Sequence, residues 1–121
     1  YYPRVSAQKI AELQENVDIL IVVENIPKAT AKNNCFQIPG KVYHYGITNK
    51  KVLVICETGI TKTLLDQYGR YAFCENTADA IGEKIVQLYY DNSPQLSEPI
   101  KDFLPKNIAA KLINAIKEIE L

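Results

Sequence analysis

The sequence has no methionine and no tryptophan, and its single histidine is His44. Its three cysteines are odd in number, widely spaced and without a second histidine, so the sequence predicts neither a metal site nor a disulfide framework. Cys56 and Cys74 lie in apolar segments, where cysteine usually packs as a small hydrophobic residue. A reducing, cytoplasmic setting is the simplest interpretation.

Neither sign of charge is in excess, because 14 basic and 14 acidic residues give a formal net charge of zero. We therefore expect no surface for nucleic acid. The longest uninterrupted apolar run, Ile19 to Val23, is far shorter than the roughly 20 residues that cross a bilayer. At 121 residues the chain suits one domain. Because it opens on Tyr1-Tyr2-Pro3 and lacks methionine, we expect an excised piece of a longer protein.

Apolar periodicity alternates between helix and strand, which predicts an α/β fold with an open parallel sheet of about three strands and flanking helices. Expected strands are residues 17–23, 52–56 and 71–74, the first of them covered on both faces. Expected helices are 6–15, 41–48, 61–68, 77–90 and 107–120, with residues 91–106 as a linker. Three strands are few for a sheet covered on both faces. We therefore expect residues 1–121 to be part of a larger Rossmann-like domain, with the rest N-terminal to Tyr1.

The ends and faces of these helices are also predictable. Ser6, Thr61 and Thr77 are expected N-caps, and Gly69 is expected to end a helix in a left-handed conformation. Three helices are expected to bury an apolar face: Ile10 and Leu13 in the first, Ala78, Ile81, Ile85 and Leu88 in the fourth, and Ile108, Leu112, Ile116 and Ile119 in the last.

Ligands of open α/β sheets bind at the carboxyl ends of the strands, where helix N-termini present unpaired N–H groups. The long segment from Glu24 to Gly40 ends at such a helix start, and Lys41 adds an ammonium there. This combination suits a phosphate group. The alternative is that Gly40 only permits the turn and that Lys41 is solvated, since the pattern is neither a Walker loop nor a dinucleotide fingerprint.

Other polar residues near the expected strand ends have two interpretations each. Glu24 and Glu57 follow strands and could bind a sugar hydroxyl, or they could be solvated loop carboxylates. His44 could act as a general base, but the sequence names no partner for it, which favours a hydrogen-bonding or packing role. Glu57, Thr58 and Gly59 form the expected turn after the second strand.

The order of these segments resembles the C-terminal half of a GT-B glycosyltransferase of the group 1 type. In that family a strand that begins with Asp and apolar residues precedes a Pro-Gly-Lys or Pro-Ser-Lys helix start, followed by a strand and a helix that ends in Gly. The matching segments are Val17 to Ile21, Ile38 to Tyr45, Lys51 to Ile55 and Leu64 to Gly69, and the likeness extends over roughly residues 3 to 118.

This resemblance implies a protein, cytoplasmic or peripheral to a membrane, that binds a nucleotide-sugar donor for polysaccharide or glycoconjugate synthesis. The acceptor, a sugar or lipid-linked sugar, would lie against an N-terminal domain absent from the chain, so this part alone would be inactive. No cofactor and no catalytic residue is implied within the chain. The implied donor-binding residues are Glu24, Gly40, Lys41, His44, Glu57, Thr58 and Gly59.

The chain departs from the family at His44, three residues after the lysine, where the family commonly has a Glu that binds the ribose. An imidazole cannot make the paired charge-assisted contacts of a carboxylate. Two alternatives therefore stay open beside a transferase. One is a GT-B-type sugar-nucleotide epimerase, and the other is a non-catalytic α/β binding or interaction module, which His44 favours.

Overall fold

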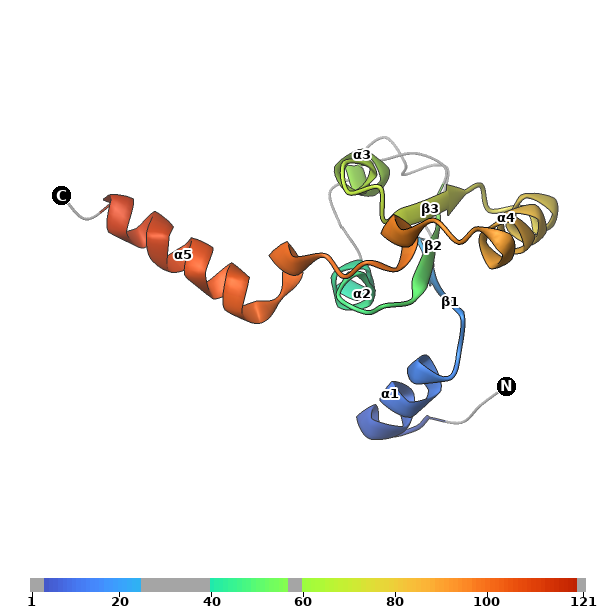
Figure 1. Ribbon diagram of the computed structural model, residues 1–121, viewed down its shortest axis with the longest axis horizontal. Coiled ribbons are helices and arrows are strands. Elements are labelled where there is room, and N and C mark those ends of the chain that lie inside the picture. The colour runs from blue at the N-terminus through green and yellow to red at the C-terminus, as the bar shows by residue number, and fades with distance from the viewer. Residues whose placement is uncertain (1–3, 25–39, 57–59, 120–121) are drawn as a thin grey trace.

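The computed structural model describes residues 4–24, 40–56 and 60–119. Figure 1 shows a small sheet with helices on both of its faces and one long helix that extends away from it. The elements follow the order α1 (Ala7–Glu15), β1 (Ile19–Val23), α2 (Gly40–Gly46), β2 (Lys51–Ile55), α3 (Ile60–Asp66), β3 (Tyr71–Cys74), α4 (Ala78–Tyr90), the 3₁₀ turns η1 (Pro94–Ser97) and η2 (Lys101–Phe103), and α5 (Pro105–Ile119). The predicted α/β fold is confirmed.

The three strands form one parallel sheet in the order β1-β2-β3, which is also their order along the chain. Ile19 pairs with Lys51 where β1 meets β2, and Val52 pairs with Tyr71 where β2 meets β3. The central strand is buried from Val52 to Ile55, as expected of a parallel strand that is apolar on both faces.

Helices cover both faces of the sheet and divide the core into two parts. On one face, Val42 of α2 and Leu65 of α3 pack against alternate strand residues such as Val54. On the other face, Leu88 of α4 packs against Leu53 and Ile55. Figure 1 shows α2 and α3 on one side of the strands and α4 on the opposite side.

The prediction that the first strand is covered on both faces is wrong. Ile21 and Val23 of β1 are 41% and 56% exposed, whereas Leu20 and Val22 on the other face are buried. The reason is that α4 packs mostly against β3 and leaves Ile21 and Val23 of β1 open. The strand also begins at Ile19 rather than Val17.

Most of the predicted helix ends are confirmed. The hydroxyls of Ser6 and Thr77 accept hydrogen bonds of 3.2 Å from the third residues of α1 and α4. Gly69 has φ of +59°, the left-handed conformation expected after α3. Thr61 is not a cap, because α3 already begins at Ile60 and Thr61 lies inside the helix.

Two predicted amphipathic helices form without burying the expected faces. Ile10 and Leu13 of α1 are exposed, and no residue of α5 is buried. Both helices project from the sheet in Figure 1 instead of lying over it. The predicted linker 91–106 contains the turns η1 and η2, and α5 begins at Pro105, two residues earlier than expected.

Candidate functional site

The residues that follow the strands lie side by side at the carboxyl edge of the sheet. The N–H of Glu24 donates to the carbonyl of Ile55 at 3.0 Å, and the N–H of Cys56 donates to the carbonyl of Cys74 at 3.1 Å. These bonds continue the pairing one residue beyond β1 and β2. The edge therefore holds a carboxylate and two thiols on a fixed backbone.

The sequence predicts a packing role for Cys56 and Cys74, and the structure buries Cys56 and leaves Cys74 half-buried. Burial, reinforced by the nearby charge of Glu24 and opposed by that of Lys62, raises the pKa of Cys56 to about 11. Burial also raises the pKa of Cys74. Because a thiol must be ionised to act as a nucleophile or metal ligand, both cysteines are held in their inert form at neutral pH.

Three of the predicted donor-binding residues lie together on α2. Gly40 and Lys41 open the helix and are exposed, and His44 is exposed one turn further along. Residues three and four apart share one face of a helix, so these three residues form a single polar face, which we call the α2 face. Val42 and Gly46 are buried against the body of the protein.

Contacts with the body of the protein fix the position of α2. The Tyr71 hydroxyl donates to the carbonyl of Val42 at 2.6 Å, and the N–H of Ile100 donates to the carbonyl of Gly46 at 2.8 Å. The Tyr43 ring meets the Phe103 ring edge-on at 5.0 Å between centroids. These contacts tie α2 to β3 and to the turn before α5, so the α2 face is presented on a rigid support.

His44 also lines a groove of about 370 Å³ between α1 and α2. The opposite wall comes from α1, including Ala11, Gln14 and Glu15, and the floor from the chain between α2 and β2. The His44 ring lies 6.0 Å from that of Tyr45, and its side chain makes no hydrogen bond with another described residue. Among the residues that the structure describes, His44 thus has no acid–base partner, and its hydrogen-bonding role stays open.

The remaining predicted residues are placed separately. Glu24 is half-buried at the carboxyl end of β1, and its charge acts on Cys56. Glu57, Thr58 and Gly59, and the segment 25–39 that leads to Gly40, lie outside the described residues. The structure therefore places Gly40, Lys41 and His44 on the α2 face and Glu24 at the carboxyl end of β1.

Sequence reasoning missed Arg70, which organises the opposite, amino edge of the sheet. Its side chain is only 1% exposed, and its guanidinium donates to the carbonyls of Leu96, of Thr48 at 2.8 Å and of Lys50 at 2.5 Å. Burial lowers the pKa of Arg70, yet a guanidinium stays charged at neutral pH. The only signal in the sequence is an arginine directly before a short strand, of which the structure buries the first residue, Tyr71.

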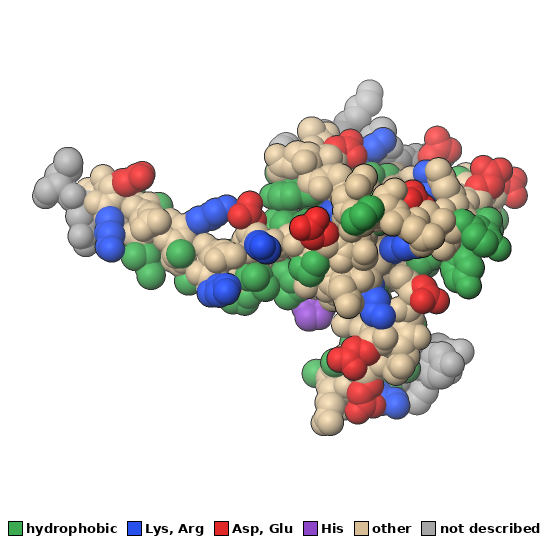
Figure 2. All heavy atoms as spheres, viewed as in Figure 1, with side chains coloured by type: hydrophobic (Ala, Val, Ile, Leu, Met, Phe, Trp, Pro, Cys, Tyr) green, Lys and Arg blue, Asp and Glu red, His purple; other side chains and the backbone are tan. Residues whose placement is uncertain are grey.

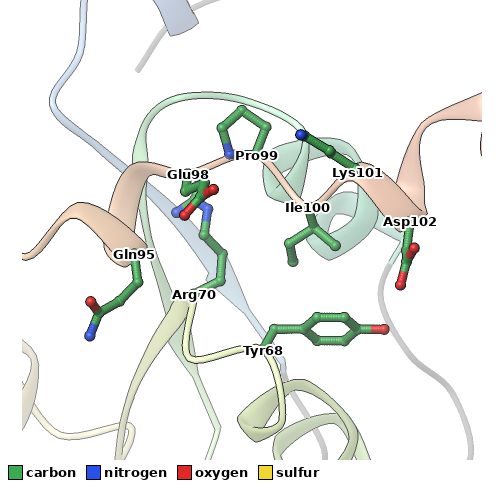
Figure 3. Close-up of a pocket in the computed structure, with 8 residues that line it drawn as sticks. All are labelled: Tyr68, Arg70, Gln95, Glu98, Pro99, Ile100, Lys101 and Asp102. Carbon is green, nitrogen blue, oxygen red and sulfur yellow. The ribbon is translucent and has the colours of Figure 1, made fainter.

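A pocket of about 350 Å³ opens beside Arg70, between the chain before β3 and the segment from η1 to η2 (Figure 3). Glu98 lines this pocket together with Arg70. In Figure 3 the side chain of Ile100 lies above the Tyr68 ring. Asp102 and Lys101 also line it. The Arg70 guanidinium already donates to three backbone carbonyls, so its role is to hold η1 and the connection between α2 and β2 together at this edge of the sheet.

Comparison of the chain with protein-family models, with curated proteins and with solved structures gave no match. Within the described ranges, no three or more His, Cys, Asp or Glu side chains are grouped so that they could hold a metal ion. None of the described helices has the length and apolarity needed to span a membrane.

Proposed function

We propose that this chain is the donor-binding part of a GT-B-type glycosyltransferase of the group 1 type, which binds a nucleotide-sugar donor for polysaccharide or glycoconjugate synthesis. The observation that carries the proposal is the α2 face, where Gly40, Lys41 and His44 are exposed together on a helix that is anchored from behind. The helix follows the first strand of a parallel sheet, the position at which such folds bind phosphate groups.

The chemistry of this face suits the diphosphate of the donor. The first N–H groups of a helix have no partner within the helix, and Gly40 has no side chain to keep a phosphate away from them. The exposed ammonium of Lys41 adds a positive charge in the same turn. As the sugar leaves the nucleotide, negative charge develops on the diphosphate, and donors fixed in advance would stabilise it.

His44 lies one turn further along the same face, where a ribose hydroxyl would be within reach of its ring nitrogens. A neutral imidazole can donate or accept one hydrogen bond there but cannot accept two as a carboxylate does. The acceptor, a sugar or lipid-linked sugar, would be held by a separate N-terminal domain of the parent protein. We accordingly propose donor binding for this chain and transfer only for the complete enzyme.

The test is an NMR titration of the 121-residue chain with a panel of nucleoside diphosphates. At least one of them should shift amide resonances of α2, and Lys41→Ala should weaken that ligand about fivefold to tenfold. Lys106→Ala, which removes an exposed lysine far along the sequence in α5, is the matched control and should leave the affinity unchanged. If no nucleoside diphosphate shifts the α2 resonances, the proposed function is wrong.

His44 favours a second candidate, a binding module that has lost transferase activity. The variant His44→Glu separates the two, because it restores the carboxylate usual in the resembled family. If the parent chain binds a nucleoside diphosphate weakly and His44→Glu tightens binding tenfold or more, the non-catalytic module is favoured. A sugar-nucleotide epimerase would instead be exposed by analysis of products formed from a nucleotide sugar by the parent protein.

A further inference from the structure

The α5 helix carries a long apolar stripe that the rest of the protein does not cover. Its apolar residues lie between 49% and 77% exposed, and none is buried. Figure 1 shows the helix extending well away from the sheet. Residues four and three apart share a face of a helix, so the stripe is continuous. It consists of Ile108, Leu112, Ile116 and Ile119.

The lysines of this helix lie away from the stripe. With about 100° between successive residues, Lys111 falls about 95° from the centre of the stripe on one side, and Lys106 and Lys117 fall about 125° and 145° from it on the other. Figure 2 shows lysines along α5 with apolar side chains between them. Within its bounds α5 has three lysines and one glutamate, a net charge of +2. Long lysine side chains in these positions can keep their ammonium groups in water while the stripe is buried.

One of these lysines has a partner within the protein. Lys111 forms an ion pair of 3.5 Å with Asp102, and both side chains are more than half exposed. Exposed pairs of this kind are weak and readily exchanged for another anion. Lys111 can therefore still face a negatively charged surface.

The charge of α5 distinguishes it from the other exposed amphipathic helix, α1. That helix also exposes apolar residues, Ile10 and Leu13, but its one lysine is outnumbered by Glu12 and Glu15. Its net charge of −1 is unfavourable near an anionic surface. The combination of an uncovered apolar stripe and a net positive charge occurs, among the described helices, in α5.

We propose that α5 binds the surface of a membrane that contains anionic lipids, lying in the plane of the interface with the stripe toward the acyl chains. Apolar area and attraction of lysines to acidic headgroups are the two terms that govern such binding. The stripe supplies the first and Lys106, Lys111 and Lys117 supply the second. With one short helix, we expect the association to be weak and reversible. This inference does not depend on the nucleotide site.

The experiment is sedimentation of the 121-residue chain with lipid vesicles. Vesicles that contain about 30% phosphatidylglycerol in phosphatidylcholine should bind the chain, whereas vesicles of pure phosphatidylcholine should bind it at least tenfold more weakly. Raising the salt from about 0.05 to 0.5 M should weaken binding to the anionic vesicles, because it shortens the range of charge attraction. Lys106→Gln with Lys117→Gln should lower binding about fivefold per lysine.

The apolar stripe is tested by Leu112→Gln with Ile116→Gln, which should reduce binding more than tenfold. The matched control is Ile10→Gln with Leu13→Gln in α1, which should leave it unchanged. All four positions are exposed, so both double variants should retain the circular dichroism of the parent chain.

Three results would overturn the proposal. The first is an absence of binding to anionic vesicles, and the second is equal binding to anionic and neutral vesicles. The third is light scattering that shows a dimer which the double variant in α5 dissociates, since a second copy would then occupy the stripe.

Discussion

Replacement of Arg70 by methionine should destabilise the fold more than any other change of a charged side chain. Arg70 is buried at the amino edge of the sheet, and its guanidinium binds three backbone carbonyls from two segments distant in sequence. Leu96 belongs to η1, whereas Thr48 and Lys50 lie between α2 and β2. Methionine has a similar length and fits an apolar environment, but it has no donor for these carbonyls.

The magnitude follows from the number of bonds. Hydrogen bonds that involve a charged group contribute about 1.5–3 kcal/mol each, so three would be worth up to roughly 5–9 kcal/mol in isolation. The guanidinium must be desolvated to form them, which offsets part of that gain. We therefore expect Arg70→Met to lower the free energy of unfolding by about 2–4 kcal/mol. This is a large part of the 5–15 kcal/mol typical of a domain.

The assay is urea unfolding followed by circular dichroism, since the chain lacks tryptophan. Arg4→Met is the matched control, because Arg4 is the other arginine of the sequence and is exposed, and it should change stability by less than about 0.5 kcal/mol. Hydrogen exchange supplies a local readout. Ile100 follows η1, and its N–H donates to the carbonyl of Gly46. This N–H should exchange faster in Arg70→Met. A loss below 1 kcal/mol, with Ile100 still protected, would refute the role given to Arg70.

Three further changes test other parts of the fold. Gly46→Ala should destabilise the protein by about 1–3 kcal/mol in urea, because the added methyl would overlap the Tyr71 hydroxyl; a variant as stable as the parent would contradict this packing. Between pH 9 and 11 the unfolded chain loses the Cys56 proton that the folded protein keeps, so stability should fall by roughly 2 kcal/mol as pH rises. Cys56→Ala should remove this part of the alkaline loss, and an unchanged pH profile would show that the thiol is not responsible. Thr77→Ala should cost about 1 kcal/mol through the lost N-cap of α4, measured by thermal unfolding, and no change in melting temperature would count against the cap.

The fold was predictable from the sequence where the signal is local. The run Val52 to Ile55 is apolar throughout, as a strand buried on both faces must be, and the structure places it at the centre of the sheet. Thr77 and Gly69 act through their own backbone and the next few residues, so their roles as a cap and as a left-handed residue could be predicted without a tertiary structure. The same holds for the helix start at Gly40 and Lys41.

Sequence periodicity could not show what each apolar face contacts. Ile10 and Leu13 have the spacing of a buried face, yet α1 lies away from the sheet and exposes them. The stripe of α5 has the same regularity and is equally uncovered. Periodicity predicts that a helix has an apolar side. Whether another segment covers that side depends on the tertiary structure.

For the candidate site, the sequence by itself determined which residues share the α2 face, because helical spacing places Gly40, Lys41 and His44 on one side. Only the tertiary structure decided what surrounds them. It placed Glu24 beside Cys56, directed His44 toward the α1 groove, and buried Arg70 among carbonyls of distant segments. The physical reason is that helix spacing and caps act over a few residues. Burial and charge pairing instead depend on segments that the fold brings together from 20 or more residues apart.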